Sequence, residues 1–228
     1  MVDLVRHGAT RIADGKQVAY TNDGSGTESL FVRDAAGATP QVPLFASAVL
    51  FKKTRSWSPD GRTVLFTQRS PETQNDLIAV PASGDRAPVP YLHETFNEDL
   101  GRFSPDGRWV AYVSDESGSN DVYVRSFPVP DHKHRVTTDG GTWVDWKRDG
   151  TALLIVGADS RQLKVADVRA GADLSIGAPQ VVGALPAGAI AWDAAGDLQR
   201  LLVSVPSSDS PGLSLTVVTD WIAAMGKR

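Results

Sequence analysis

The sequence contains no cysteine, so no disulfide can stabilise the fold and no thiolate can act as a nucleophile or metal ligand. It also lacks any run of about 18 apolar residues, so no membrane insertion of this chain is expected. Long basic runs are missing too, because 23 basic and 27 acidic residues are interspersed and the net charge is −4. A nucleic acid is therefore not an expected partner.

Hydrophobic residues make up 41% of the chain and charged residues 22%, which is enough apolar material for a buried core. All-β proteins of this length often form one domain, and a single domain over residues 1–228 is expected. The segment Met1–His7 has neither the basic nor the apolar region of a signal peptide. It begins almost inside a structural unit, which indicates a piece of a longer protein.

An Asp-Gly turn recurs every 43 to 46 residues along the chain. The turns are Asp14-Gly15, Asp60-Gly61, Asp106-Gly107, Asp149-Gly150 and the degenerate Ala195-Gly196. In all copies but the first, an aromatic residue stands three positions before the turn, namely Trp57, Phe103, Trp146 and Trp192. We expect these side chains to lie in the core between neighbouring units rather than in a ligand-stacking site.

Each copy of the turn is followed by strand-like segments. In the third copy, the apolar run Val110–Val113 predicts a buried strand, and the alternating Val122–Arg125 predicts the second arm of a hairpin. A weaker strand, Arg135–Thr138, closes the unit. Four antiparallel strands per period of about 45 residues are typical of a propeller blade. The sequence thus predicts an all-β fold, a β-propeller of about five four-stranded blades. Their approximate bounds are 8–52, 53–98, 99–141, 142–187 and 188–228.

The fifth unit lacks an obvious fourth strand before Arg228. Two arrangements would solve this problem. Val2–Val5 could complete the last blade and remove two exposed edges. Alternatively, the chain forms an open arc whose blade edges pair between two copies, which predicts a homodimer.

The segments Trp57–Arg62 and Phe103–Arg108 read Trp-Ser-Pro-Asp-Gly-Arg and Phe-Ser-Pro-Asp-Gly-Arg. They resemble the signature of WD-repeat-like propellers in TolB-type periplasmic proteins and in prolyl oligopeptidase relatives. The run from Phe103 through Asp121–Pro128, together with the ending Leu215–Trp221, further resembles the C-terminal propeller of bacterial membrane-anchored serine/threonine protein kinases.

The resemblance implies a sensor or interaction module without catalytic activity, one that binds a protein, peptide or envelope ligand at the propeller face. It also implies a fragment of a kinase-type protein in the bacterial cell envelope or periplasm. No Gly-rich phosphate loop, catalytic loop or metal-binding Asp-Phe-Gly is present, so kinase activity is not expected.

Residues seven and eight positions before each turn are expected to enter the innermost strand and to line the mouth of the channel. The candidates for binding there are His7, Lys53, Glu98, Asp99, Thr142 and Asp145. Four residues could form a divalent metal site for zinc, calcium or manganese, namely His7, His93, Glu98 and Asp99. This site carries the alternative function, a metal-dependent hydrolase of the phosphotriesterase or lactonase type. No catalytic residue is assigned.

His132 and His134 alternate on an expected outer strand, so both should face one way and form a second candidate metal pair. Asp76 and Asp121 lie near hairpin turns, and turn chemistry explains them. Arg6–Thr10 resembles the Arg-His-Gly signature of histidine phosphatases. That family has an α/β fold, which the strand-and-turn repeats contradict.

Overall fold

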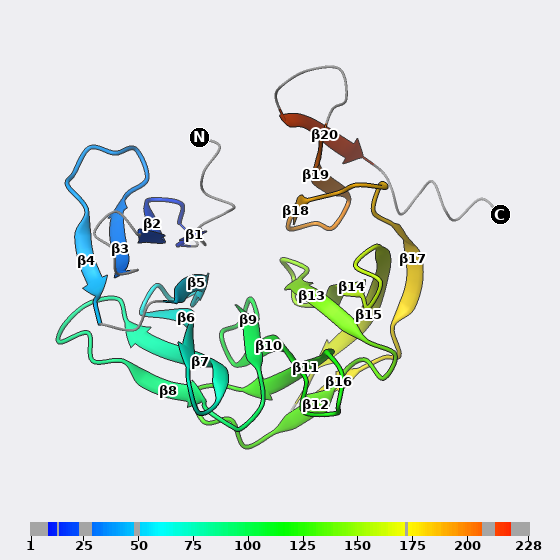
Figure 1. Cartoon of the computed structure of the whole chain (residues 1–228), viewed down its shortest axis with the longest axis horizontal. Helices are drawn as coiled ribbons and strands as arrows, with labels where there is room; N and C mark the ends of the chain where they lie inside the picture. The colour runs from blue at the N-terminus through cyan, green and yellow to red at the C-terminus, as the bar shows by residue number, and fades with distance from the viewer. Residues whose placement is uncertain are drawn as a thin grey trace. The chain divides into compact units, whose positions relative to one another are not determined.

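The computed structural model describes residues 9–12, 14–22, 29–47, 51–171, 173–206 and 213–219. Within these ranges the chain forms 20 β-strands in five sheets and no helix (Figure 1). Accordingly, this part of the chain has no helix long and apolar enough to cross a membrane.

The first three sheets each contain four strands. The first has the order β1-β2-β3-β4, with β1 at Ala9–Arg11, β2 at Gln17–Asn22, β3 at Ser29–Asp34 and β4 at Val42–Phe45. The second has the order β5-β6-β7-β8, with β5 at Lys52–Trp57, β6 at Thr63–Ser70, β7 at Gln74–Pro81 and β8 at Val89–Leu92. The third has the order β12-β11-β10-β9, with β9 at Glu98–Phe103, β10 at Trp109–Ser114, β11 at Asp121–Ser126 and β12 at Lys133–Arg135.

The last two sheets depart from the four-strand pattern. The fourth comprises β13 at Gly141–Trp146, β14 at Ala152–Gly157, β15 at Gln162–Ala170, β16 at Leu174–Ile176 and β17 at Gln180–Ala184, with both β16 and β17 paired to β15. The fifth has the order β18-β19-β20, with β18 at Ala191–Ala194, β19 at Arg200–Pro206 and β20 at Leu213–Thr219. The expected closing strand Val2–Val5 lies outside the described residues, as does His7.

The chain divides into two compact units. The first contains the first and second sheets and most of the third, and the second contains the fourth and fifth sheets with Asn120–Val122. The antiparallel four-stranded sheets confirm the predicted fold class. The single-domain prediction and the exact unit bounds stay predictions.

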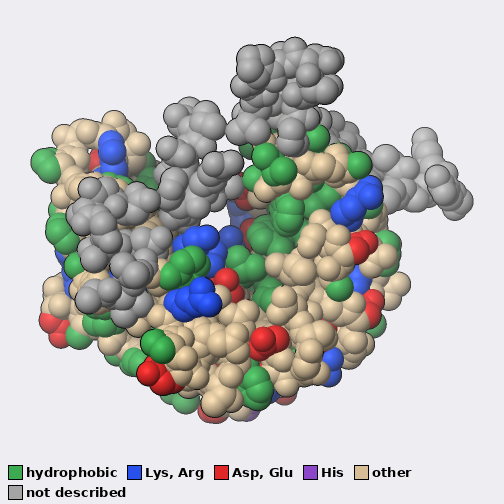
Figure 2. Space-filling view, in the orientation of Figure 1, with side chains coloured by type: hydrophobic (Ala, Val, Ile, Leu, Met, Phe, Trp, Pro, Cys, Tyr) green, Lys and Arg blue, Asp and Glu red, His purple; other side chains and the backbone are tan. Residues whose placement is uncertain are grey.

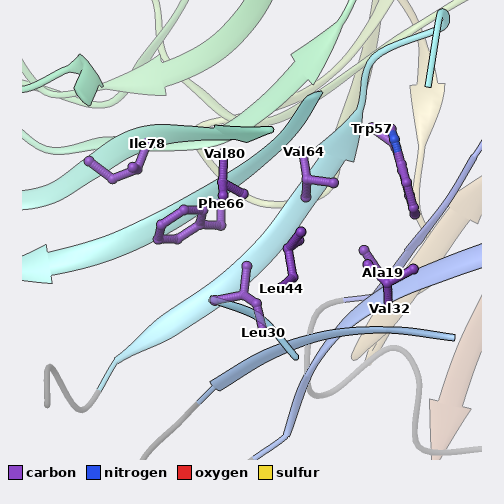
Figure 3. Close-up of a cluster of buried hydrophobic side chains, with 9 residues drawn as sticks. All are labelled: Ala19, Leu30, Val32, Leu44, Trp57, Val64, Phe66, Ile78 and Val80. Atoms are coloured by element: carbon purple, nitrogen blue, oxygen red, sulfur yellow. The ribbon is translucent and has the colours of Figure 1, made fainter. Parts of the chain in front are cut away.

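The core of the first unit lies between successive sheets, because side chains alternate across each strand. Along β6, Val64 and Phe66 face the first sheet, while Leu65 packs against the third. Figure 3 shows the first of these two cores, with Trp57 beside residues of the first sheet. Phe103 occupies the matching place in the core between the second and third sheets. Each fully buried side chain of this kind stabilises the fold by about 1.5–3 kcal/mol.

In the second unit, the core lies between the fourth and fifth sheets. Leu154 and Val156 of β14 pack with Leu201 and Val203 of β19, and Trp192 packs against this cluster. Trp57, Phe103 and Trp192 thus confirm the expectation that the repeated aromatic residue lies between neighbouring sheets.

The Ser-Pro-Asp-Gly turn joins the first two strands of the second and third sheets. In the second sheet, Ser58 Oγ donates to Asp60 Oδ1 at 2.6 Å and accepts from Thr63 N at 2.9 Å. Gly61 has a φ of 74°, a conformation that glycine adopts without steric cost. Ser104 and Gly107 repeat this arrangement in the third sheet. The recurrence of the motif follows from this local geometry.

Candidate binding surface on the first strands of two sheets

The first strands of the second and third sheets, β5 and β9, lie side by side in the first unit. Each contains a β-bulge. In β5 the register shifts between Thr54 and Ser56, so Arg55 is the extra residue. In β9 the shift lies between Asp99 and Arg102, where Leu100 has a φ of 60°. Bulges change the direction in which side chains point and are frequent beside functional sites.

Arg55 is the centre of a polar network that links the two sheets. Its Nη2 lies 2.5 Å from Asp99 Oδ1, and its Nε donates to Thr67 Oγ1 at 2.7 Å. Thr67 Oγ1 donates in turn to Asp99 Oδ1 at 2.5 Å, as does Leu100 N at 2.6 Å. Arg102 donates to the backbone carbonyl of Arg55. Lys53 of β5 is the cross-strand neighbour of Thr67 on β6. We call Lys53, Arg55, Thr67, Asp99 and Arg102 the arginine cluster.

The charges of the arginine cluster are unequal, with three cationic side chains and one carboxylate. Burial lowers the pKa of Arg55, Asp99 raises it, and the nearby guanidinium of Arg102 lowers it. Arginine nevertheless keeps its charge in proteins. Lys53 Nζ lies 5.0 Å from the centre of the Phe51 ring. Figure 2 shows Lys and Arg side chains gathered where β5 and β9 run, with an acidic side chain among them.

A second polar group lies between the same two sheets, near the start of β7 and β9. We call Asp76, His93, Glu94, Glu98 and Arg125 the carboxylate cluster. Asp76 Oδ2 lies 2.9 Å from His93 Nδ1, and Glu94 Oε1 lies 2.7 Å from Arg125 Nη1. Glu94 N donates to Glu98 Oε2 at 3.4 Å.

Glu98 is buried, with 3% of its surface exposed. Burial raises the pKa of Glu98 to about 8. The amide of Glu94 and the charge of Arg125 lower it, whereas the carboxylates of Glu94 and Asp76 raise it. A carboxyl with this pKa is largely protonated at neutral pH.

The structure separates the residues that the sequence grouped into one metal site. Glu98 belongs to the carboxylate cluster and Asp99 to the arginine cluster, because neighbouring residues of a strand point to opposite faces. His93 is paired with Asp76, and His7 lies outside the described residues. Within the described ranges, no group of three or more His, Asp or Glu side chains could hold a metal ion. A site that includes His7 stays a prediction.

The remaining candidates are spread over both units. Lys53 lies in the first unit, in the arginine cluster. Thr142 and Asp145 belong to the second unit, where Thr142 donates to the Gly157 carbonyl at 3.1 Å and Asp145 accepts from Trp146 N at 2.8 Å.

The second candidate metal pair lies on the outer strand β12 and its approach. The rings of His132 and His134 lie 6.5 and 5.7 Å from the ring of Trp109, both edge to face, which agrees with the expectation that they face one way. Whether they bind a metal stays a prediction.

Sequence reasoning missed Arg55, Thr67 and Arg102. Arg55 and Arg102 stand five and four residues before their Asp-Gly turns, on strands already predicted to be innermost. The charge of Arg55 and Arg102 could have indicated that they belong to a site. The β-bulges that set the direction of their side chains have no sequence signature.

No protein-family model matches the chain. The Tol-Pal system protein TolB of Anaeromyxobacter dehalogenans strain 2CP-C is 34% identical over 110 residues, which cover 48% of this chain and 24% of that protein. TolB of Anaeromyxobacter sp. strain K matches to the same extent. The matched segment thus spans about a quarter of the length of these curated relatives.

Solved structures extend the likeness to nearly the whole chain. TolB from Acinetobacter baumannii superposes with a TM-score of 0.75 at 17% identity, over 94% of this chain and 52% of that one. Puromycin hydrolase superposes with a TM-score of 0.60 at 14% identity, over 93% of this chain and 35% of the hydrolase chain. The periplasmic gluconolactonase of Pseudomonas aeruginosa superposes with a TM-score of 0.57 at 15% identity, over 93% of this chain and 72% of the gluconolactonase chain. The chain therefore has the fold of a TolB-like β-propeller, and its five sheets are consistent with the predicted number of blades.

Proposed function

We propose that this chain is a protein-binding propeller module without catalytic activity and that the arginine cluster is part of its binding surface. The observation that carries the proposal is the network of Arg55, Asp99 and Arg102, which places two guanidinium groups on the adjacent first strands β5 and β9, with Lys53 also on β5. Charged and aromatic side chains fixed on a rigid sheet are suited to recognition of a protein partner. The TolB-like fold supports this function.

The cellular setting of the module belongs to the same proposal. The name of the curated relatives refers to the Tol-Pal system, and a bacterial envelope or periplasmic location fits this likeness. That the chain is a fragment of a kinase-type protein rests on the resemblance of its sequence motifs to the kinase-associated propellers. A homodimer formed through open sheet edges also stays a prediction.

The alternative function is a metal-dependent hydrolase. Structures named as a puromycin hydrolase and a gluconolactonase share the fold, but one propeller fold hosts many unrelated functions. The alternative depends on His7, and it predicts turnover of lactones or activated phosphate esters that a chelator abolishes.

The test of the proposed function compares two double variants with the same change in charge. Lys53→Glu/Arg102→Glu alters the arginine cluster. Arg62→Glu/Arg108→Glu alters the Asp-Gly turns of the same two sheets, where the side chains are 86% and 57% exposed. Each immobilised protein is incubated with an envelope extract of the source bacterium, and bound proteins are quantified by mass spectrometry.

We expect one partner to be retained by the wild type and the turn variant, and to fall at least about tenfold with the cluster variant, a loss of about 1.4 kcal/mol. If both variants retain the partner equally, the binding surface lies outside the arginine cluster. Chelator-sensitive turnover would favour the hydrolase instead. Thermal unfolding of both variants separates loss of binding from loss of fold.

A further inference from the structure

The arginine cluster keeps like charges close together. Arg55 and Arg102 lie near enough for one guanidinium to lower the pKa of the other, and Arg102 donates to the Arg55 backbone. The carboxylate of Asp99 already accepts from Arg55, Thr67 and Leu100 N through Oδ1. Among the described residues, the arginine cluster as defined therefore contains one carboxylate and three cationic side chains.

The backbone under this cluster is strained as well. Leu100 lies in the left-handed region, with a φ of 60°, immediately after Asp99. A non-glycine residue in this conformation is strained, and such residues concentrate at ligand-binding sites. Here the bulge and the Leu100 amide fix the Asp99 carboxylate, and Asp99 in turn fixes the guanidinium of Arg55. The strained bulge therefore holds Asp99, and through it the guanidinium of Arg55, in a fixed position.

The surroundings of the cations identify the chemistry of a ligand. Guanidinium groups bind carboxylates through strong charge-assisted hydrogen bonds, and Arg55 already contacts the carboxylate of Asp99. Lys53 lies over Phe51, which adds an apolar ring beside the charge. A protein segment offers both carboxylate and apolar side chains.

We propose that the arginine cluster binds the carboxylate side chains of an acidic segment in the protein partner. This inference rests on the proposed function and specifies its ligand. Arg102 and Lys53 make the charge contacts, Arg55 is positioned by Asp99 and Thr67, and Phe51 packs against the segment.

Binding is measured by nuclear magnetic resonance on the arginine Nε–Hε signals of the whole chain. The probes are an acetylated and amidated octapeptide of alternating Glu and Gly, the same peptide with Gln in place of Glu, inorganic phosphate, and an eight-nucleotide thymidine strand. The protein variants are Lys53→Gln/Arg102→Gln and the matched control Arg62→Gln/Arg108→Gln.

We expect the Glu peptide to shift the Arg55 and Arg102 signals in a saturable manner, with the Gln peptide at least about tenfold weaker. The cluster variant should lose this binding by a similar factor and the control should keep it. Salt should weaken it, because the contacts are electrostatic. Equal binding of the two peptides, preference for phosphate or for the thymidine strand, or unchanged binding by the cluster variant would overturn the inference.

The two proposals fail in different ways. If no acidic peptide binds but capture of a partner still depends on Lys53 and Arg102, the protein-binding function stands and the acidic ligand is wrong. If capture is independent of the cluster as well, both proposals are wrong.

Discussion

Two aspartates at corresponding places in the second and third sheets have different surroundings. Asp121 begins β11, and its side chain is fully buried. Its Oδ1 accepts from Thr137 Oγ1 at 2.7 Å and from Gly140 N at 3.0 Å, and its Oδ2 accepts from Arg135 at 2.7 Å. Both oxygens of this carboxylate are satisfied.

Asp76 lies near the start of β7, and 2% of its side chain is exposed. Its Oδ2 accepts from Thr73 Oγ1 at 2.9 Å and contacts His93, whereas its Oδ1 accepts no hydrogen bond from the described residues. Glu98 lies close enough for the charge of Asp76 to raise its pKa. The repeat thus places an acid at the same point in both sheets, but only the third sheet surrounds it with a complete set of donors.

The largest expected effect comes from removing each carboxylate. Asp121→Ala leaves the Thr137 hydroxyl, the Gly140 amide and the Arg135 guanidinium without their acceptor, and should cost about 3 kcal/mol. Asp76→Ala should cost about 1 kcal/mol, because fewer donors depend on it and a negative charge beside Glu98 disappears. Urea unfolding gives both values, and hydrogen exchange of the Gly140 amide reports the local loss. Equal costs for the two variants would contradict the comparison.

The next effect concerns the acid beside Asp76. The pKa of Glu98 rises from 4.5 to about 8 on folding because of burial, so the native state holds a proton that the unfolded state releases in this pH window. Stability therefore falls as pH rises between these values. Glu98→Gln removes the ionisable group, and should raise the free energy of unfolding by on the order of 2 kcal/mol at pH 8.5, and by little at pH 4.5.

Thermal or urea unfolding at both pH values measures this effect. Glu72→Gln, a change at an exposed residue of the β6–β7 turn, is the matched control and should show the same pH profile as the wild type. A difference between Glu98→Gln and the wild type that stays constant with pH would exclude a buried proton on Glu98.

The sheets and the turns were predictable because they depend on local patterns. Alternation of apolar residues defines the strands, and the positive φ of Gly61 and Gly107 explains why glycine recurs in the turn. The extra strand β16 was not expected, because it has only three residues, Leu174–Ile176, and these pair with the end of β15 without a recognisable strand pattern.

The sites were less predictable, because their partners are distant in sequence. Asp76 and Asp121 looked like turn residues, since an acid beside a hairpin has the same local sequence whether it is exposed or buried. Both side chains are buried, which the local sequence did not predict. Arg55 meets Asp99 only through the packing of two sheets and two bulges. The opposite orientation of Glu98 and Asp99 could have been anticipated from strand alternation.

The smallest expected effect concerns the cationic neighbours of the two aspartates. Arg135 is 42% exposed and His93 is 53% exposed, so solvent screens both ion pairs. Arg135→Gln should still cost about 1 kcal/mol, because its charge neutralises a fully buried carboxylate and its Nε also donates to the Thr137 carbonyl. His93→Gln keeps a donor for Asp76 and should change stability by less than about 0.5 kcal/mol. Urea unfolding at neutral pH checks the order. If His93→Gln costs as much as Arg135→Gln, the carboxylate of Asp76 depends on its partner as strongly as that of Asp121, and the contrast between the two sheets is wrong.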